Sequence, residues 1–588
     1  RARPAGRRRD HPDKFVEHLG PAQHPAGATV REHERVTDAL GQRIVQRQAE
    51  LDRTRQTHVA GWESVRHWLQ PEAIPFTAAA QNQHESPPSD RPHILENTGG
   101  DASDNLAAAL YGSLTNSGTM WSKVRIRRAA LNDTPGVKRA LSEINTRIFQ
   151  SFEAPRAGYH KQIPSVFKSC VDFGWGALFQ AGRANDLPVF TAVPVQQLAI
   201  ARDIDRRVDT VFRRFTRTAR QVVQEFGDAV PEKIRKRAAK KPDQSIELIH
   251  AVFPREDGFG RAGARGMPIA SVHVLIETKT TLRESGYEEM PYHIFEWALD
   301  PGREYPRGVG HKARYDVQLL QRVHEGQARG VELLNEPPLM VANDGVTSKV
   351  SLRRGALNYV DSETMAAGRD PIKALNHGSR PDVAEDYMAG VRQRIERYYL
   401  NHLIQLTRDA RMTATHALLL DEETQRLLGP TLGGFISTLA GMVERQFLLL
   451  LRNGLVPPPP AIMEGEPFEV EFVSPMIQRQ RLAEVRGLSQ SFDIVAPMAD
   501  RSPDLLDNYD FDEVTRFVNE RLNVPANLLR APRDVQTLRT QRQEEADAAQ
   551  QRDDMVATAQ AAAQGGQALQ SAANAQALQR PGGQGRQR

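Results

Sequence analysis

One stretch of the chain, Val383 to Gly454, constrains the fold most, because it has the pattern of two long helices joined by a short polar break. Apolar or aromatic positions of the first helix are separated by three or four residues, as in a helix that packs against neighbours. They are Met388, Val391, Ile395, Tyr398 or Tyr399, His402 and Leu406. A helix over 383–408 would be roughly 39 Å long at 1.5 Å per residue. The opposite face carries Arg392, Arg394, Glu396 and Arg397, which suit water or another charged surface.

The break after this helix, residues 407–419, contains Arg408, Asp409 and Arg411. A second helix is then expected, with acidic residues in its first turn and an end at Asn453-Gly454 before four prolines. Pro430 and the glycine pair at 433–434 predict a kink in it.

A third long helix is expected at 311–335, with Val317, Leu320 and Val323 facing inward and a stop at Pro337-Pro338. Short strands around the turn signal Asn343-Asp-Gly345 follow. Residues 336–382, which carry Lys349, Arg353 and Arg354, thus form a module between two long helices. Such a module must project from the far end of the helix pair.

The remaining chain mixes helices with strands, so the expected fold class is α+β and mainly helical. Four strands are predicted at 177–180, 189–193, 198–201 and 208–215, and a fifth at 468–472. Arg213 and Arg214 end one of them, and a structural or inter-subunit role is favoured over DNA contact. A helix is expected from Arg31 to about Arg55 and another over 61–69. Beyond Gln541, Gln and Ala dominate, and both a weak helix and a disordered tail remain open.

Bulk properties exclude several classes of protein. The 588 residues carry 77 Lys and Arg against 73 Asp and Glu, a net charge of +4, which argues against a general nucleic-acid coat. The single cysteine, Cys170, lies in an apolar run and is expected to be a buried, inert thiol. We expect no metal site, no cofactor and no membrane span, since no uncharged apolar run approaches 18 residues.

A glycine pattern at Gly258–Gly263 matches the dinucleotide-binding motif in letters but not in context. Phosphate binding needs a helix N-terminus after the glycines, whereas Pro268 and a strand-like run follow here. A hairpin turn is preferred, and a nucleic-acid-processing enzyme with a nucleotide site at this loop is the alternative. No Walker lysine, zinc spacing or nucleophile elbow is present in the sequence.

Three strings resemble the portal, or head-to-tail connector, proteins of short-tailed phages. They are RMTATHALLLDEETQRLLGPTLGGFISTLAGMVERQFLLLLRNGLVPPPP, FGWGALFQ with the strands that follow it, and GREYPRGVGHKARYDVQLLQRVHEGQARGVELLNEPPLMVANDGV. In that family a tunnel loop joins a stem helix to a long wing helix, and about twelve subunits ring a DNA channel. The resemblance covers most of residues 61–545.

The resemblance implies a portal fold with wing, stem, clip and crown regions. It divides the chain into an N-terminal arm (1–60), wing (61–310), stem helix (311–335), clip (336–382), stem helix (383–406), tunnel loop (407–419), wing with a long kinked helix and a strand (420–480), crown (481–545) and tail (546–588). The stem packs through Val391, Ile395, Tyr398 and His402. Arg408 and Arg411 of the tunnel loop would contact DNA, although Arg408 equally suits the C-terminal cap of the preceding helix.

The implied function is a virion channel at one capsid vertex for DNA packaging, retention and ejection, with no active site. Its implied partners are other copies of the chain, double-stranded DNA bound without sequence preference, major capsid protein, scaffolding protein, terminase, tail adaptor and internal ejection proteins. The protein would be made in the host cytoplasm. A capsid or tail adaptor without DNA contact is a third possibility.

Overall fold

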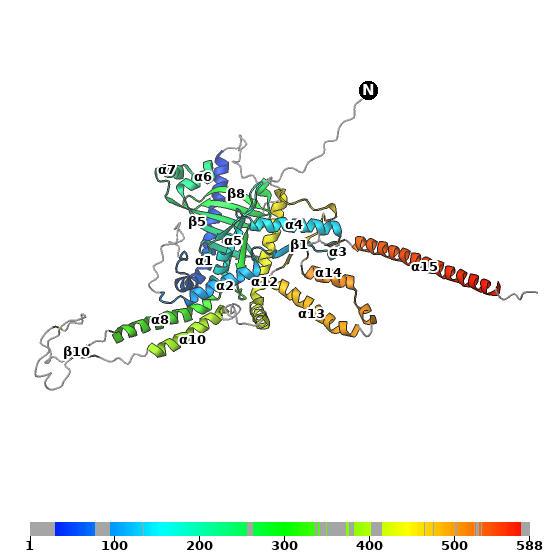
Figure 1. The fold of residues 1–588 in the computed structure, drawn as a ribbon. Coiled ribbons are helices and arrows are strands. Elements are labelled where there is room, and N and C mark those ends of the chain that lie inside the picture. The colour runs from blue at the N-terminus through cyan, green and yellow to red at the C-terminus, as the bar shows by residue number, and fades with distance from the viewer. Residues whose placement is uncertain are drawn as a thin grey trace, which may run out of the picture. The chain divides into compact units, whose positions relative to one another are not determined.

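The computed structural model describes residues 30–76, 94–132, 134–255, 263–335, 339–341, 349, 372–374, 381–401, 414–463, 465–473, 475–499, 503–522, 524, 529–530 and 532–577. Two compact units are distinguished, Arg1–Asn132 with Ala140–Glu484, and Asp133–Arg139 with Val485–Arg588. The first unit contains all the sheets, and the described part of the second is helical (Figure 1).

The largest sheet is antiparallel and has the strand order β4-β5-β6-β7-β8. Its strands are β4 (Leu198–Arg202), β5 (Val208–Thr218), β6 (Ser245–Pro254), β7 (Ile269–Leu275) and β8 (Thr280–Tyr287). Side chains alternate between its faces, as strand geometry requires. On β6, Ile246 and Leu248 pack with the short helices α6 (Ala219–Phe226) and α7 (Glu232–Lys240). Ile249 and Ala251 on the other face pack with α1.

Helix α1 (Val30–Leu69) is one continuous helix of 40 residues, not the two separate helices expected at 31–55 and 61–69. The expected boundary between residues 60 and 61 therefore falls inside it. Ile44 and Leu51 are buried against the large sheet, and Trp62 and Val65 enter the main core. These buried positions are too widely spaced among polar residues to reveal a core helix in the sequence.

A three-stranded sheet, β3-β2-β9, lies at the centre of the first unit. It consists of β2 (Trp175–Ala181), β3 (Val189–Val193) and β9 (Tyr292–Glu296). Helix α5 (Tyr159–Phe173) packs on β2 and β3, and helix α12 (Ala414–Arg452) packs on β9. The rings of Phe167, Phe295 and Phe435 meet here with centroid distances of 5.5 to 5.8 Å. Such aromatic contacts add to the burial of apolar area.

Two small sheets join parts of the chain that are far apart in sequence. β1 (Ser122–Ile126) pairs antiparallel with β12 (Phe468–Phe472), and β10 (Leu339–Val341) pairs with β11 (Ile372–Ala374). Helix α2 (Thr98–Leu114) packs on α5, and α3 (Ala129–Asn132) and α4 (Pro135–Glu153) follow β1 in the chain. The side chain of Asn145 on α4 accepts a hydrogen bond from the Val124 amide.

The described part of the second unit includes the helices α13 (Pro475–Ala499, from Val485 onward), α14 (Phe511–Arg521) and α15 (Pro532–Ala577). The Asp510 carboxylate accepts hydrogen bonds from the Asp512 and Glu513 amides and so caps the N-terminus of α14. For the C-terminal residues a weak helix and a disordered tail were both left open. The described part is a helix, α15, and almost all of its described side chains are exposed.

Candidate functional site

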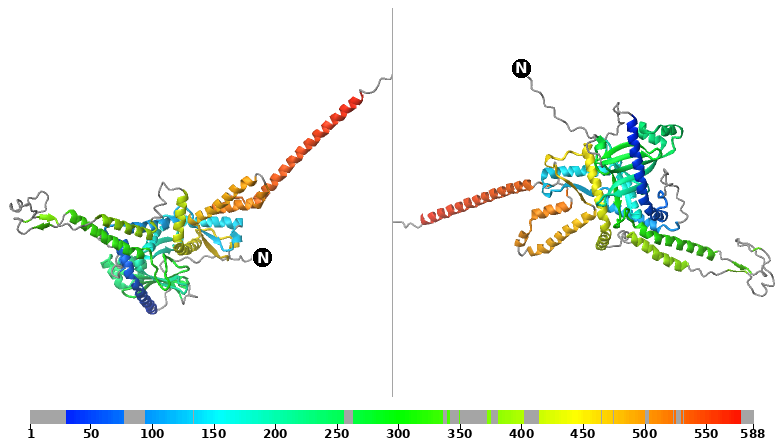
Figure 2. Two further views of the ribbon diagram at one scale, coloured as in Figure 1. Left: turned by 90° about the horizontal axis from the view of Figure 1, so that it is seen from below. Right: turned by 180° about the vertical axis from the view of Figure 1, so that it is seen from behind.

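Two long helices of the first unit, α8 (Gly310–Asn335) and α10 (Pro381–Tyr398), pack against each other and run side by side in all three views (Figures 1 and 2). Apolar residues three or four positions apart form the seam between them. Ala313, Val317 and Leu320 on α8, and Met388, Val391 and Ile395 on α10, are buried in one hydrophobic cluster. The sequence-predicted residues Val391 and Ile395 therefore lie in the core.

The two tyrosines at the end of α10 have opposite environments. Tyr399 is fully buried in the core of this chain, whereas Tyr398 is 38% exposed at the surface of the helix pair. Successive residues of a helix point about 100° apart, and only one of the pair can face the seam. Tyr398 instead hydrogen-bonds Asp316 at the surface, and its pKa is raised, first by partial burial and then by this carboxylate.

The chain leaves the helical path earlier than the sequence predicts. α10 ends at Tyr398, and Leu400 has a φ of 54°, a left-handed conformation that closes the turn. The expected helix continued to residue 406 because the apolar spacing continues to His402 and Leu406. His402 and the whole of 402–413, including Arg408 and Arg411, lie outside the described residues. α12 begins at Ala414, so residues 414–419 of the expected loop are helical.

A buried carboxylate, Asp172 on α5, lies where the helices at the base of the pair converge. It accepts hydrogen bonds from Gln70 Nε2 at 2.5 Å and Ser103 Oγ at 2.6 Å, and Lys168 Nζ lies 3.3 Å away. The hydroxyl of Tyr399 faces the same carboxylate, and burial first, then this charge, raise the pKa of Tyr399. Asp172 thereby joins α2 and α5 to the residues that directly follow α1 and α10. It is the only charged residue between Cys170 and Gly176, which is the signal that the sequence offered.

Ion pairs hold the outer side of the α8–α10 pair to the segment before α2. Arg392 Nε lies 2.6 Å from Glu96 Oε1, and Arg392 Nη1 lies 2.6 Å from Glu385 Oε1. These hydrogen bonds, to Glu96 first, raise the pKa of Arg392. Gln321 accepts hydrogen bonds from the Leu95 and Glu96 amides. The face assigned to water or to a charged surface thus partly binds this chain's own carboxylates.

Large apolar side chains remain exposed along the same helix pair. They are Tyr315, Val331 and Leu334 on α8, and Val383, Tyr387 and Tyr398 on α10, each with 38 to 64% of its surface accessible. Within the described part of the chain nothing covers them. Scattered apolar side chains are ordinary on a surface, but six on one helix pair form a candidate contact surface.

The far end of the pair carries the β10–β11 ribbon, in which Leu339 pairs with Ala374 and Val341 with Ile372. Lys349 is exposed. Arg353, Arg354 and the turn signal at 343–345 lie outside the described residues. The two strands therefore belong to the segment between the long helices, 336–382.

Helix α12 packs in the core of the protein, although part of its sequence is apolar enough for a membrane helix. Thr431–Arg452 is long and apolar enough by composition to cross a membrane, yet half of its most apolar stretch is buried in the protein. Its charged and polar residues have internal partners. Arg445, only 2% exposed, pairs with Glu289 at 2.9 Å, and Gln446 bonds Gln180 and Ser151 at 2.7 Å.

The residues of the glycine pattern lie between two antiparallel strands, not between a strand and a helix. β6 precedes it, and after residues 256–262, which lie outside the description, a single turn at Gly263–Gly266 leads into β7. A turn of four residues offers no row of helix amides to a phosphate. Arg213 and Arg214 have partners inside the subunit, Gln197 at 3.0 Å and Glu247 at 2.7 Å. Burial raises the pKa of the Cys170 thiol, as expected for an inert cysteine.

Comparison with known proteins gives one consistent result. The family model described as bacteriophage head to tail connecting protein matches residues 41–529. A probable portal protein of Bordetella phage BPP-1 is 26% identical over 520 residues, 86% of this chain and 92% of that protein. The portal protein of Salmonella phage epsilon15 is 25% identical over 538 residues, 90% of this chain and 95% of that protein.

Proposed function

The chain belongs to the bacteriophage head to tail connecting proteins, whose function is that of a phage portal, and we propose that it works as a closed ring around a DNA channel. The observation that carries the function is the match of the family model over residues 41–529. Portals form part of the virion at the connection of head and tail, so capsid and tail proteins are its partners.

The exposed apolar surface of α8 and α10 supports the ring. A surface of this kind on one subunit meets a different surface on the next in a heterologous contact, and such contacts close into a ring when the rotation fits. By family resemblance we propose about 12 subunits. The α8–α10 pair then forms the stem, residues 336–382 form the clip, and residues 407–419 form the tunnel loop.

The DNA channel is proposed to be indifferent to sequence. A channel that passes any genome has to touch phosphates weakly and read no bases, because tight binding would stop translocation. A nearly balanced total charge of +4 over 588 residues suits such weak contact. Arg408 and Arg411 are the residues proposed to touch phosphates, and Lys349, Arg353 and Arg354 give the clip its positive charge.

The remaining partners follow from the same role. We propose that the clip binds terminase during packaging and the tail adaptor afterwards, and that scaffolding protein and internal ejection proteins contact the ring inside the head. The family is one of structural connectors, and we propose that this chain hydrolyses no nucleotide itself. The turn between β6 and β7 favours no nucleotide site, so the enzyme alternative has no support from the glycine pattern. Synthesis takes place in the host cytoplasm.

The test is the position of the protein in the virion. A fusion of the chain to a small gold-binding tag, expressed during infection with a phage lacking its own copy, is imaged in purified particles. Label at a single vertex, at the junction of head and tail, is expected. Label spread over the capsid faces, or confined to the distal tail, would rule out the proposed function.

A further inference from the structure

Between α1 and the segment that leads into α8 lies a cavity of about 240 Å³. It is lined by Thr57, His58, Gly61, Arg303, Pro306, Arg307, His311, Arg314 and Tyr315. Three of these nine residues are arginines and two are histidines, and none is acidic. We call this cavity the arginine pocket. Tyr315 also belongs to the exposed surface of α8 and α10, and none of the nine lies in the stem seam, the clip or the tunnel loop.

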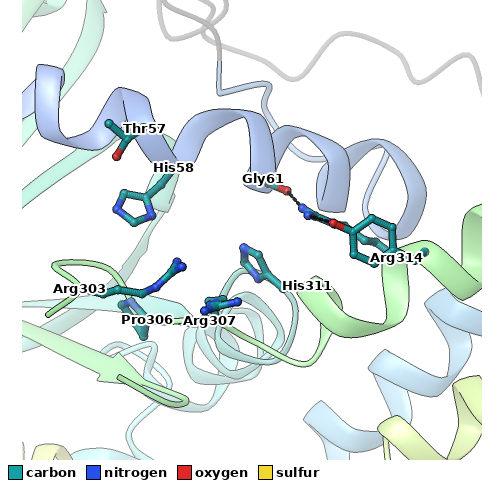
Figure 3. Close-up of a pocket in the computed structure, with 9 residues that line it drawn as sticks. Thr57, His58, Gly61, Arg303, Pro306, Arg307, His311 and Arg314 are labelled. Atoms are coloured by element: carbon teal, nitrogen blue, oxygen red, sulfur yellow. Dashed lines mark hydrogen bonds between the residues drawn. The ribbon is translucent and has the colours of Figure 1, made fainter. Parts of the chain in front are cut away.

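The side chains of the pocket come from three directions. Figure 3 shows His58 on α1 facing Arg303, Arg307 and His311 across the same space. Arg303 and Arg307 belong to the segment after β9, and His311 lies in the first turn of α8, at the positive end of the helix dipole. Donors therefore surround the cavity instead of lining one wall.

Close backbone contacts fix the segment that carries the arginines. Gly174 has a φ of 95°, and a Cβ there would lie 2.6 Å from the Arg307 carbonyl carbon. A Cβ on Gly308 would lie 2.4 Å from the Val171 oxygen, and one on Gly310 would lie 2.6 Å from the Asp172 oxygen. These glycines let the 306–310 segment lie directly against α5. The arginine pocket is thus preformed by the core.

The positive charge of the pocket exceeds the negative charge near it. Asp300 pairs with Arg307 at 2.9 Å and with Arg303 at 3.5 Å, and Glu304, which lies near His58, pairs with Arg202, so two carboxylates lie near the three arginines of the pocket. Arg314 donates to the Gly61 carbonyl and the Tyr315 hydroxyl, both neutral, and its buried Nε has no partner among the described residues. A buried N–H donor without a partner costs free energy unless a ligand or water fills the site.

The histidines are held neutral by their surroundings. Burial first, and then the nearby arginines, lower the pKa of His311 to about 4. Burial, Arg303 and Arg307 also lower the pKa of His58. At neutral pH the His58 imidazole is therefore uncharged and has one N–H to donate to an anion, whereas the His311 imidazole is already hydrogen-bonded to the Asp172 backbone.

We propose that the arginine pocket binds a phosphate group. A carboxylate has two oxygens in one plane and is satisfied by a single guanidinium, whereas phosphate has oxygens in several directions and more charge. The donors that converge from α1, the 303–307 segment and α8 match the geometry of a phosphate group. The phosphate is either inorganic phosphate or part of a DNA backbone. The proposal does not depend on ring formation or on the portal function.

Titration of the full-length protein with inorganic phosphate, followed by calorimetry, tests the binding. One phosphate per chain is expected, with binding at least about tenfold weaker in the double variant Arg303→Gln/Arg307→Gln, because charged hydrogen bonds to the anion are lost. The control Arg235→Gln/Lys236→Gln removes the same charge from exposed positions of α7 and keeps wild-type binding. Arg307→Lys, which keeps the charge but not the guanidinium fork, is expected to bind with intermediate strength.

Absence of phosphate binding in the wild type, equal binding in the double variant, or equally tight binding of acetate would overturn the proposal. The source of the phosphate is then distinguished with a short duplex DNA. If the pocket holds backbone phosphate, the slope of log affinity against log salt falls by about 0.9 per lost contact in the double variant but not in the control. Identical slopes, together with weakened phosphate binding, identify inorganic phosphate as the ligand.

Discussion

At the scale of single residues, the stem depends most on the buried positions of α10. Ile395 has no exposed surface and lies among apolar side chains of α8 and the core. Ile395→Asp places an unpaired charge there, at a cost on the order of several kcal/mol. A large fall in the thermal unfolding midpoint is expected. Gln393→Asp, an exposed position on the same helix, is expected to change stability by at most about 0.5 kcal/mol, and equal midpoints for the two variants would contradict the packing.

Three histidines inside the fold, His250, His273 and His293, make it sensitive to acid. Burial lowers the pKa of His273 and of His293 to about 3, with the charges of Arg283 and Arg445 as respective further causes. A histidine in the unfolded chain has a pKa near 6.5. The stability that comes from keeping these histidines neutral is therefore complete above pH 6.5 and is lost as the pH falls toward 3. Each histidine contributes about 1.4 kcal/mol per pH unit within that window.

The acid sensitivity is measured by urea unfolding at pH 7 and pH 5. His293 Nε2 lies 2.7 Å from Gln180 Oε1, a contact that the amide of glutamine can also make. Between pH 7 and pH 5 the free energy of unfolding of His293→Gln should therefore fall by about 2 kcal/mol less than that of the wild type. This difference is the contribution of one histidine over the roughly 1.5 pH units between 6.5 and 5. An unchanged pH dependence would show that His293 is not buried in neutral form.

Sequence reasoning at this scale found the helical seam but not its last residue. The spacing predicted Val391 and Ile395, whereas the choice between Tyr398 and Tyr399 depends on helix rotation that adjacent aromatic residues leave open. Asp172 was missed because its partners, Gln70 and Ser103, lie 102 and 69 positions away. The arginine pocket escaped notice for the same reason, since α1 and α8 are brought together only by the fold.

At the scale of elements, the exposed side of α8 and α10 is the surface proposed to meet neighbouring subunits. Leu334→Asp with Tyr387→Asp replaces two exposed apolar side chains, so folding of the subunit should be unaffected while assembly is weakened. Native mass spectrometry should show a shift toward single chains. Ile204→Asp is the control, since Ile204 is 97% exposed at the β4–β5 turn. Assembly of the wild type, the double variant and the control to the same size would refute the interface.

Elements with strong local signals were predicted well from the sequence. Helix α8 was expected at 311–335 and spans Gly310–Asn335. Strand pairing was not predictable, because β1 and β12 are separated by more than 300 residues and their register depends on tertiary contacts. The early end of α10 coincides with the left-handed backbone conformation of Leu400, which no sequence pattern predicts.

At the scale of the whole molecule, the account requires weak contact with DNA along a channel. Arg408 and Arg411 are the cations of the proposed tunnel loop, and repetition around a ring would multiply their effect. Alanine substitutions of both, introduced together into the phage, are expected to leave rings intact and to reduce packaged DNA or its retention. Arg426→Ala, an exposed cation on α12, serves as the control. Wild-type packaging and retention in the double variant would exclude the arginines as DNA contacts.

The central claim is that copies of this chain close into a ring with a hole at its centre. Electron microscopy of the purified full-length protein tests it directly, with the particle mass compared against multiples of 65.6 kDa. The account predicts class averages of closed rings of about 12 subunits with a central channel. Single chains, or compact particles without a channel, would contradict it.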